Sequence, residues 1–158
     1  MGLDMYLSKR TYVKNWDYMK PKDRHKVTVK KGGKVSADIK PERVTHIIEE
    51  VGYWRKFNAL HNWFVENVQN GEDDCKEYYV DASDLQKALE VLKEVSANRN
   101  VYEPNTPTTA EKLLPTTPGF FFGATDYDDY YYEEVDRTIE LFEALVKEGG
   151  DFYYQSSW

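Results

Sequence analysis

Two hydrophobic periods occur along this chain of 158 residues, and together they restrict the folds it can adopt. Leu3, Met5 and Leu7 alternate with polar neighbours, and an alternating pattern returns in residues 151–158. A period of two predicts strands that bury one face. Between the two ends, apolar residues recur every three or four positions, which predicts helices. We therefore expect a single α+β domain over residues 1–158, with a mostly antiparallel sheet and about three helices.

The turn and cap signals divide the chain into shorter elements. Gly32-Gly33 lies between two alternating arms and predicts a hairpin over residues 26–35. Asp81 is expected to cap a helix that ends near Asn98. The other expected helices are 52–69 and about 130–147. The other expected strands are 2–8, 43–51, 76–80, 120–122 and 151–158, and residues 11–14 either extend the first of these or begin another strand. Residues 15–25 and the polar, Pro- and Thr-rich residues 100–119 are expected to be loops.

Composition excludes several classes of protein. A single cysteine excludes an internal disulfide framework and a zinc site built from cysteines. No apolar run approaches the length of about 20 residues that spans a bilayer, so no membrane partner is expected. The net charge of −7 argues against a protein that binds duplex nucleic acid, although it leaves a local basic pocket open. The three histidines lack ligand spacing, so neither a metal nor a cofactor is predicted.

The strongest local signal lies in the predicted helix 52–69. On a helix, Trp54, Asn58 and His61 share one face, and Phe57, Leu60 and Phe64 form an apolar stripe on the opposite side. A face of Trp, Asn, His and Arg is poorly suited to mere solvation. It is well suited to stacking on a heterocycle and hydrogen-bonding to it, with arginine meeting negative charge. The alternative interpretation is that the tryptophans belong to the core and that His61 is a satisfied structural histidine.

Two further clusters mix aromatic side chains with hydroxyls and amides. One is the Pro- and Gly-framed segment 114–127 around Phe120-Phe121-Phe122, and the other is the C-terminal Phe152–Trp158. Together with the helix, they supply the predicted ligand-binding residues, namely Trp54, Arg55, Lys56, Asn58, His61, Asn62, Trp63, Thr125, Tyr127, Gln155 and Trp158. His61 is also the one candidate for a catalytic acid or base. We expect Trp54, Trp63, Tyr127, Tyr154 and Trp158 to surround one pocket.

Four separated motifs resemble a group of small uncharacterised proteins of tailed phages and prophages. They are Met-Gly-Leu-Asp-Met-Tyr-Leu at the start, Tyr-Trp-Arg-Lys-x-Asn-x-x-His-x-Trp-Phe at 53–64, Gly-Phe-Phe-Phe-Gly-x-Thr-x-Tyr-Asp at 119–128 and Gln-Ser-Ser-Trp at the end. Some members carry a kinase-like label, whereas this chain has no phosphate-cradling glycine loop. The resemblance implies a phage accessory protein that acts in the cytoplasm of the bacterial host.

Three functions follow as hypotheses from the residues and the resemblance. The first is binding of a nucleotide-like small polar ligand, which would sequester a host-defence signal, with a homo-oligomer left open. The second is an enzyme that acts on a nucleotide-type substrate through His61. The third is a protein–protein inhibitor of a host factor that uses exposed aromatics. The first fits best, because aromatic, amide and basic side chains are expected around an enclosed pocket. Phage proteins that mimic nucleic acid need a dense acidic surface, whereas the acidic residues here are interspersed with Lys and Arg.

Overall fold

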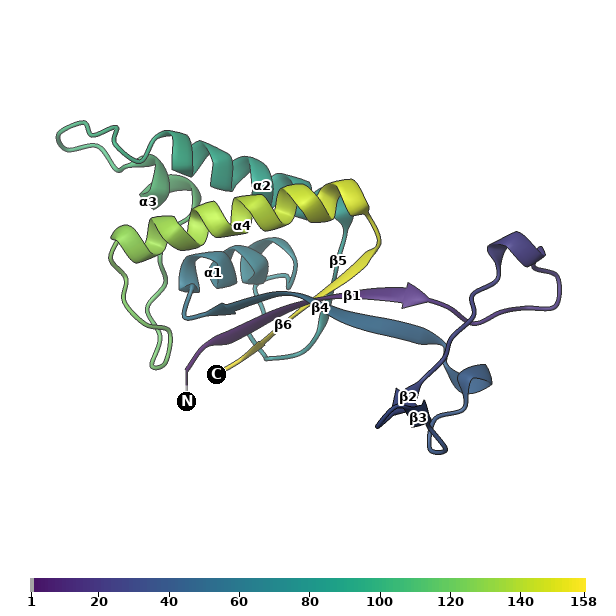
Figure 1. The fold of residues 1–158 in the computed structure, drawn as a ribbon. Helices are drawn as coiled ribbons and strands as arrows, with labels where there is room; N and C mark the ends of the chain where they lie inside the picture. Colours follow the sequence, from purple (N-terminus) through teal and green to yellow (C-terminus); the bar gives the residue numbers. More distant parts are fainter. Residues whose placement is uncertain (1) are drawn as a thin grey trace.

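A four-stranded antiparallel sheet covered by helices on one face forms the body of the molecule (Figure 1). The structure is a computed structural model and describes residues 2–158. The strand order is β4-β1-β6-β5, where β1 is Asp4–Tyr12, β4 is His46–Arg55, β5 is Tyr78–Val80 and β6 is Asp151–Ser157. The two central strands therefore come from the two ends of the chain. This arrangement confirms the α+β fold with a mostly antiparallel sheet.

Four α-helices belong to this body. They are α1 (Asn58–Asn67), α2 (Ala82–Ala97), the short α3 (Thr109–Leu113) and α4 (Asp129–Glu148). As predicted, Asp81 caps α2, and its carboxylate accepts a hydrogen bond from the Ser83 amide at 2.8 Å. Asp128 caps α4 in the same way, through the Tyr131 amide. Figure 1 shows α1, α2 and α4 on the same face of the sheet.

The core lies between that sheet face and the helices. Alternation places Phe152, Tyr154 and Ser156 of β6 on the buried face, as the sequence predicts. Leu85, Leu89 and Leu92 supply the buried stripe of α2, and α4 contributes its own apolar stripe. The residues that alternate with these on the opposite face of β6, such as Tyr153 and Gln155, are partly buried or exposed.

Several local predictions are wrong. The predicted helix 52–69 begins only at Asn58, because residues 52–55 complete β4 by pairing with β1. Residues 100–119 contain α3, whose capping box is formed by Thr108 and Glu111. Residues 120–122 form a turn and not a strand, since Phe122 bonds back to the Gly119 carbonyl and no strand pairs with them. The hairpin turn at Gly32-Gly33 is present, but each of its strands, β2 (Lys30–Lys31) and β3 (Lys34–Val35), has only two residues.

Residues 13–45 leave this body as an arm. They connect β1 to β4 and contain only the β2–β3 hairpin and two single 3-10 turns, Pro21–Asp23 and Pro41–Arg43. Figure 1 shows the arm projecting beyond the end of the sheet, away from the helices. Val13 is its one buried residue. The arm therefore adds almost nothing to the hydrophobic core.

None of the helices among residues 2–158 combines the length and the apolar character that crossing a bilayer requires.

Candidate functional site

A cleft of about 470 Å³ opens beside α1, within the range typical of small-ligand sites. One wall is the segment 117–122, which carries the three phenylalanines, and the other wall holds Trp158 and Asp73. We call this space the His61 cleft, and its lining residues are His61, Asn62, Val65, Asp73, Thr117, Pro118, Gly119, Phe120, Phe121, Phe122 and Trp158. His61 and Asp73 are the only ionisable side chains among these. The cleft is therefore mainly apolar and contains no Lys or Arg.

A chain of hydrogen bonds fixes the acidic wall of the cleft. Asp73 accepts a bond from the Trp158 indole nitrogen at 3.0 Å and a second from His61 Nε2, also at 3.0 Å. The other ring nitrogen of His61, Nδ1, lies 2.8 Å from the Tyr154 hydroxyl. Because a carboxylate only accepts, Nε2 donates to Asp73, and in the neutral ring Nδ1 is then the acceptor of the Tyr154 hydroxyl. Four side chains thus form one ordered series, Trp158–Asp73–His61–Tyr154.

Tyr154 anchors the buried end of this series. It is fully buried, and its ring stacks on Phe64 with centroids 4.0 Å apart and planes 10° from parallel. Burial, with smaller contributions from Asp73 and Cys75, raises the pKa of the Tyr154 phenol well above its usual 10. The phenol therefore stays protonated and remains a donor to His61. His61 itself is 1% exposed, so neither of its nitrogens has a free lone pair or proton to offer to a substrate.

Asn58 fixes the opposite wall. Its side-chain amide donates to the carbonyls of Phe122 at 3.0 Å and Ala124 at 2.9 Å, and its oxygen accepts from the Thr117 amide at 2.9 Å. Asn58 is 2% exposed, one turn before His61 on α1. The two buried polar residues of α1, Asn58 and His61, therefore hold the 117–124 segment and Asp73 in place. Asn58 acts as a clamp on the 117–124 segment, which explains why an amide stands at a buried position.

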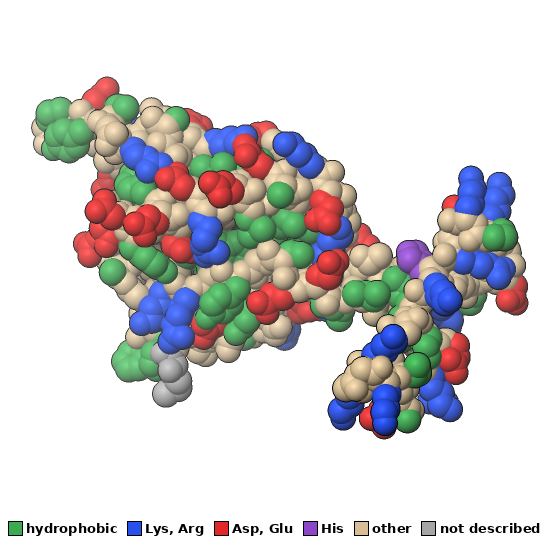
Figure 2. Space-filling view, in the orientation of Figure 1, with side chains coloured by type: hydrophobic (Ala, Val, Ile, Leu, Met, Phe, Trp, Pro, Cys, Tyr) green, Lys and Arg blue, Asp and Glu red, His purple; other side chains and the backbone are tan. Residues whose placement is uncertain are grey.

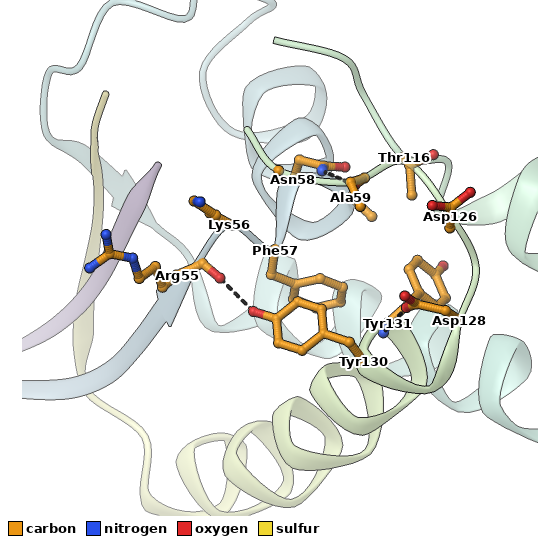
Figure 3. A pocket seen from close by; sticks show the side chains of 12 residues that line it. Arg55, Lys56, Phe57, Asn58, Ala59, Thr116, Asp126, Asp128, Tyr130 and Tyr131 are labelled. Atoms are coloured by element: carbon orange, nitrogen blue, oxygen red, sulfur yellow. Dashed lines mark hydrogen bonds between the residues drawn. The ribbon is translucent and has the colours of Figure 1, made fainter. Parts of the chain in front are cut away.

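A second, smaller cavity of about 230 Å³ lies on the other side of the 117–124 segment, at the start of α1 (Figure 3). Phe57, Tyr130 and Tyr131 form its aromatic part, and Asp126 and Asp128 flank it. The Tyr130 hydroxyl donates to the Arg55 carbonyl at 2.6 Å. Figure 3 shows the Arg55 guanidinium pointing away from these rings. The cations beside the cavity therefore do not converge on it, and its charges are mixed.

The structure does not gather the predicted ligand-binding residues around one pocket. Only His61, Asn62 and Trp158 line the His61 cleft, whereas Arg55, Lys56 and Asn58 line the smaller cavity. Trp54 and Trp63 are buried in the core, and Trp54 lies on β4 and not on the helix face expected for it. The remaining three are engaged within the protein: Tyr127 with the Thr116 amide, the Thr125 carbonyl with the Thr116 hydroxyl, and Gln155 with the Cys75 carbonyl.

The expectation that five aromatics surround one pocket is wrong for the same reason. Of those five, only Trp158 lines the cleft, while Tyr154 lies fully buried behind His61. The side chain that sequence reasoning missed is Asp73. It follows Glu72 in an acidic run that reads as a solvated turn, and only the fold brings it beside a histidine twelve residues earlier and the last tryptophan.

Within residues 2–158, no group of three or more His, Cys, Asp or Glu side chains is arranged to hold a metal ion. No protein-family model, curated protein or solved structure matches this chain.

Proposed function

We propose that this protein binds a nucleotide-like small molecule through its base, in the His61 cleft, without transforming it. The observation that supports this most is the pairing of exposed aromatic surface with an anchored carboxylate. Trp158 lines the cleft and is 50% exposed, and its indole nitrogen donates to Asp73, which lines the same cleft. A flat heterocycle with ring and exocyclic N–H groups complements both features. Stacking of a base on an aromatic side chain contributes roughly 1–3 kcal/mol.

Asp73 has the hydrogen-bonding capacity that such a base requires. Each of its oxygens accepts one bond from the protein and retains a second acceptor site. The side chain is 26% exposed, so these sites face the cleft without being freely solvated. Two adjacent N–H donors, such as those of a guanine edge, would match the two oxygens. A base that presents hydrogen-bond acceptors at that edge would bind poorly, because the carboxylate has no proton to donate to them.

Phosphate groups would lie outside the cleft, because no Lys or Arg lines it. Arg55 and Lys56 approach the other side of the 117–124 segment, where the Lys56 side chain packs beside Gly123 and both approach Gly2. We therefore expect the base to set most of the affinity, with a modest and salt-dependent gain from phosphates that reach these cations.

The burial of His61 and the hydrogen bonds at both of its ring nitrogens favour a binding role over acid–base chemistry. Both ring nitrogens are engaged by Asp73 and Tyr154, and the ring is shielded from solvent. A general base needs a lone pair within reach of the substrate proton. His61 is thus better suited to positioning Asp73. In a phage-infected cell, such a binder would act by sequestering its ligand, which is the role suggested by the resemblance to phage proteins.

The test is calorimetric titration with the free nucleobases, nucleosides and cyclic and linear nucleotides of guanine, adenine, uracil and cytosine. Asp73→Asn should weaken binding by at least about tenfold, since an amide group replaces one charged acceptor by a donor. Asp126→Asn, a matched carboxylate change beside the smaller cavity, should leave the affinity unchanged. Absence of heat with every member of the panel would contradict the proposal.

A parallel incubation separates binding from turnover. Chromatography of the ligands after prolonged contact with the protein should return them intact. If a product appears and His61→Gln abolishes it while thermal unfolding stays cooperative, the protein is an enzyme and the binding proposal fails.

A further inference from the structure

The arm of residues 13–45 differs sharply in charge from the body. It contains ten Lys and Arg against four Asp and Glu, a net charge of +6, whereas the rest of the chain contains eleven against twenty-four, a net charge of −13. Figure 2 shows Lys and Arg side chains at both tips of the arm. The overall charge of −7 is therefore the sum of two regions of opposite sign. A field that falls off over about 10 Å leaves the tips of a projecting arm locally positive.

The cations of the arm also lack carboxylate partners in the part of the chain that the structure describes. Within residues 2–158, none of its ten Lys and Arg side chains forms a salt bridge, although seven of the eleven elsewhere do so. Lys30, Lys31 and Lys34 lie around the Gly32-Gly33 turn, where the positive φ angles of 59° and 79° allow a tight reversal. Three lysines are thus presented at the tip of a short hairpin without any neutralising partner.

Exposed aromatic rings accompany these charges. Trp16 is 45% exposed and Tyr18 is 83% exposed, and the Lys14 ammonium lies 5.0 Å from the centroid of the Trp16 ring. The loop that carries both rings is closed by a pair of hydrogen bonds between the Asn15 side chain and the His25 backbone, at 2.7 and 2.8 Å. The rings therefore lie on a closed loop among cations, although they contribute little to any core.

From these observations we propose that the arm binds single-stranded nucleic acid. Its lysines would contact phosphates and release counterions, and Trp16 and Tyr18 would stack on unpaired bases. Lysine suits contacts that do not depend on base sequence, because its ammonium is a point charge on a flexible stem. The exposed rings favour a single strand over a duplex, whose bases are already stacked. The acidic body would repel the same polyanion and so confine the contact to the arm.

A second negatively charged partner could also bind the arm, namely the acidic body of another copy of this protein. An acidic protein surface offers fewer and less regular charges than a phosphate backbone, and it offers no bases for Trp16 and Tyr18. We therefore favour the nucleic acid and make self-association an outcome of the test.

The experiment measures fluorescence anisotropy of labelled oligonucleotides of about 20 residues, as single-stranded RNA, single-stranded DNA and duplex DNA. Between roughly 50 and 200 mM salt, single strands should bind with a steep, linear dependence of log affinity on log salt. Replacing Lys30, Lys31 and Lys34 together with Gln should reduce that slope by about 2, at about 0.7 per lost phosphate contact. Trp16→Ala should weaken binding roughly five- to a hundredfold and leave the slope unchanged.

The matched control replaces Lys87, Lys112 and Lys147 of the body with Gln, which alters the net charge by the same amount. It should bind as the wild type does. The proposal is overturned if no single strand binds at low salt, if the duplex binds as tightly as the single strands, or if the control loses as much affinity. It is also overturned if sedimentation shows a self-associated protein whose assembly the arm variant abolishes. The relative affinities for RNA and DNA identify which single strand is preferred.

Discussion

Replacing Trp54 with alanine is expected to lower the free energy of unfolding by about 3–5 kcal/mol. The side chain is fully buried, its indole N–H donates to the Thr138 hydroxyl at 2.8 Å, and its ring meets Phe142 edge-on at 6.0 Å. Alanine would leave a large cavity and remove a donor from Thr138. Urea-induced unfolding followed by circular dichroism measures the change.

Trp16→Ala is the matched control, because that ring is half-exposed on the arm and outside the core. It should alter the unfolding free energy by no more than about 0.5 kcal/mol. The outcome also tests the ligand-stacking role that the sequence predicts for Trp54. If Trp54→Ala cost less than about 1 kcal/mol and abolished ligand binding, Trp54 would belong to a binding site and not to the core.

Above pH 10, stability should fall by about 1.4 kcal/mol per pH unit for each of two buried tyrosines, Tyr131 and Tyr154. Burial raises the pKa of both phenols above 10, and each hydroxyl is bonded, Tyr131 to the Leu114 carbonyl and Tyr154 to His61. In the unfolded chain these phenols lose their protons near pH 10, whereas the folded protein retains them. The unfolded state then binds fewer protons than the folded state. The stabilisation that these phenols contribute is therefore fully present below pH 10 and decreases as the pH rises above it.

Urea unfolding at about pH 9, 10 and 11 measures this slope directly. Tyr154→Phe and Tyr131→Phe should each remove about 1.4 kcal/mol per pH unit from it, whereas Tyr18→Phe on the exposed arm should leave it unchanged. An unchanged slope in both buried variants would mean that other groups cause the alkaline loss. Tyr154→Phe should also cost about 1–3 kcal/mol at neutral pH, because it leaves His61 Nδ1 buried without a donor.

Features that depend on neighbours in sequence could be predicted, and features that depend on pairing across the fold could not. Asp81 caps α2 through an amide two residues away, so residue type and spacing suffice. By contrast, Tyr53 and Trp54 fit either an alternating strand or the start of a helix. Pairing with Tyr6 and Met5 of β1 decides for the strand. The capping box of Thr108 and Glu111 was a readable signal for α3, but the surrounding prolines and threonines obscured it.

The candidate site divides in the same way. Asn58 and His61 stand out because they place hydrogen-bonding groups on one predicted helix face, opposite the apolar stripe, and the structure places both at buried positions beside the cleft. Their partners, however, come from segments far along the chain, as Asp73, Thr117 and Tyr154 illustrate. No spacing rule relates these positions to the helix. Sequence therefore indicated Asn58 and His61, which shape the site, but not Asp73, the carboxylate that His61 positions.

The pairing of β1 with β4 continues to Tyr12 and His46, whereas β6 accompanies β1 only as far as Arg10. The last two residues of β1 thus belong to a two-stranded ribbon that joins the arm to the body without sharing its core. Substitutions in the arm can change what it contacts at little cost to folding, while substitutions in the body are constrained by packing. The ribbon thus allows the sequence of the arm to change without disturbing the packing that holds the body together.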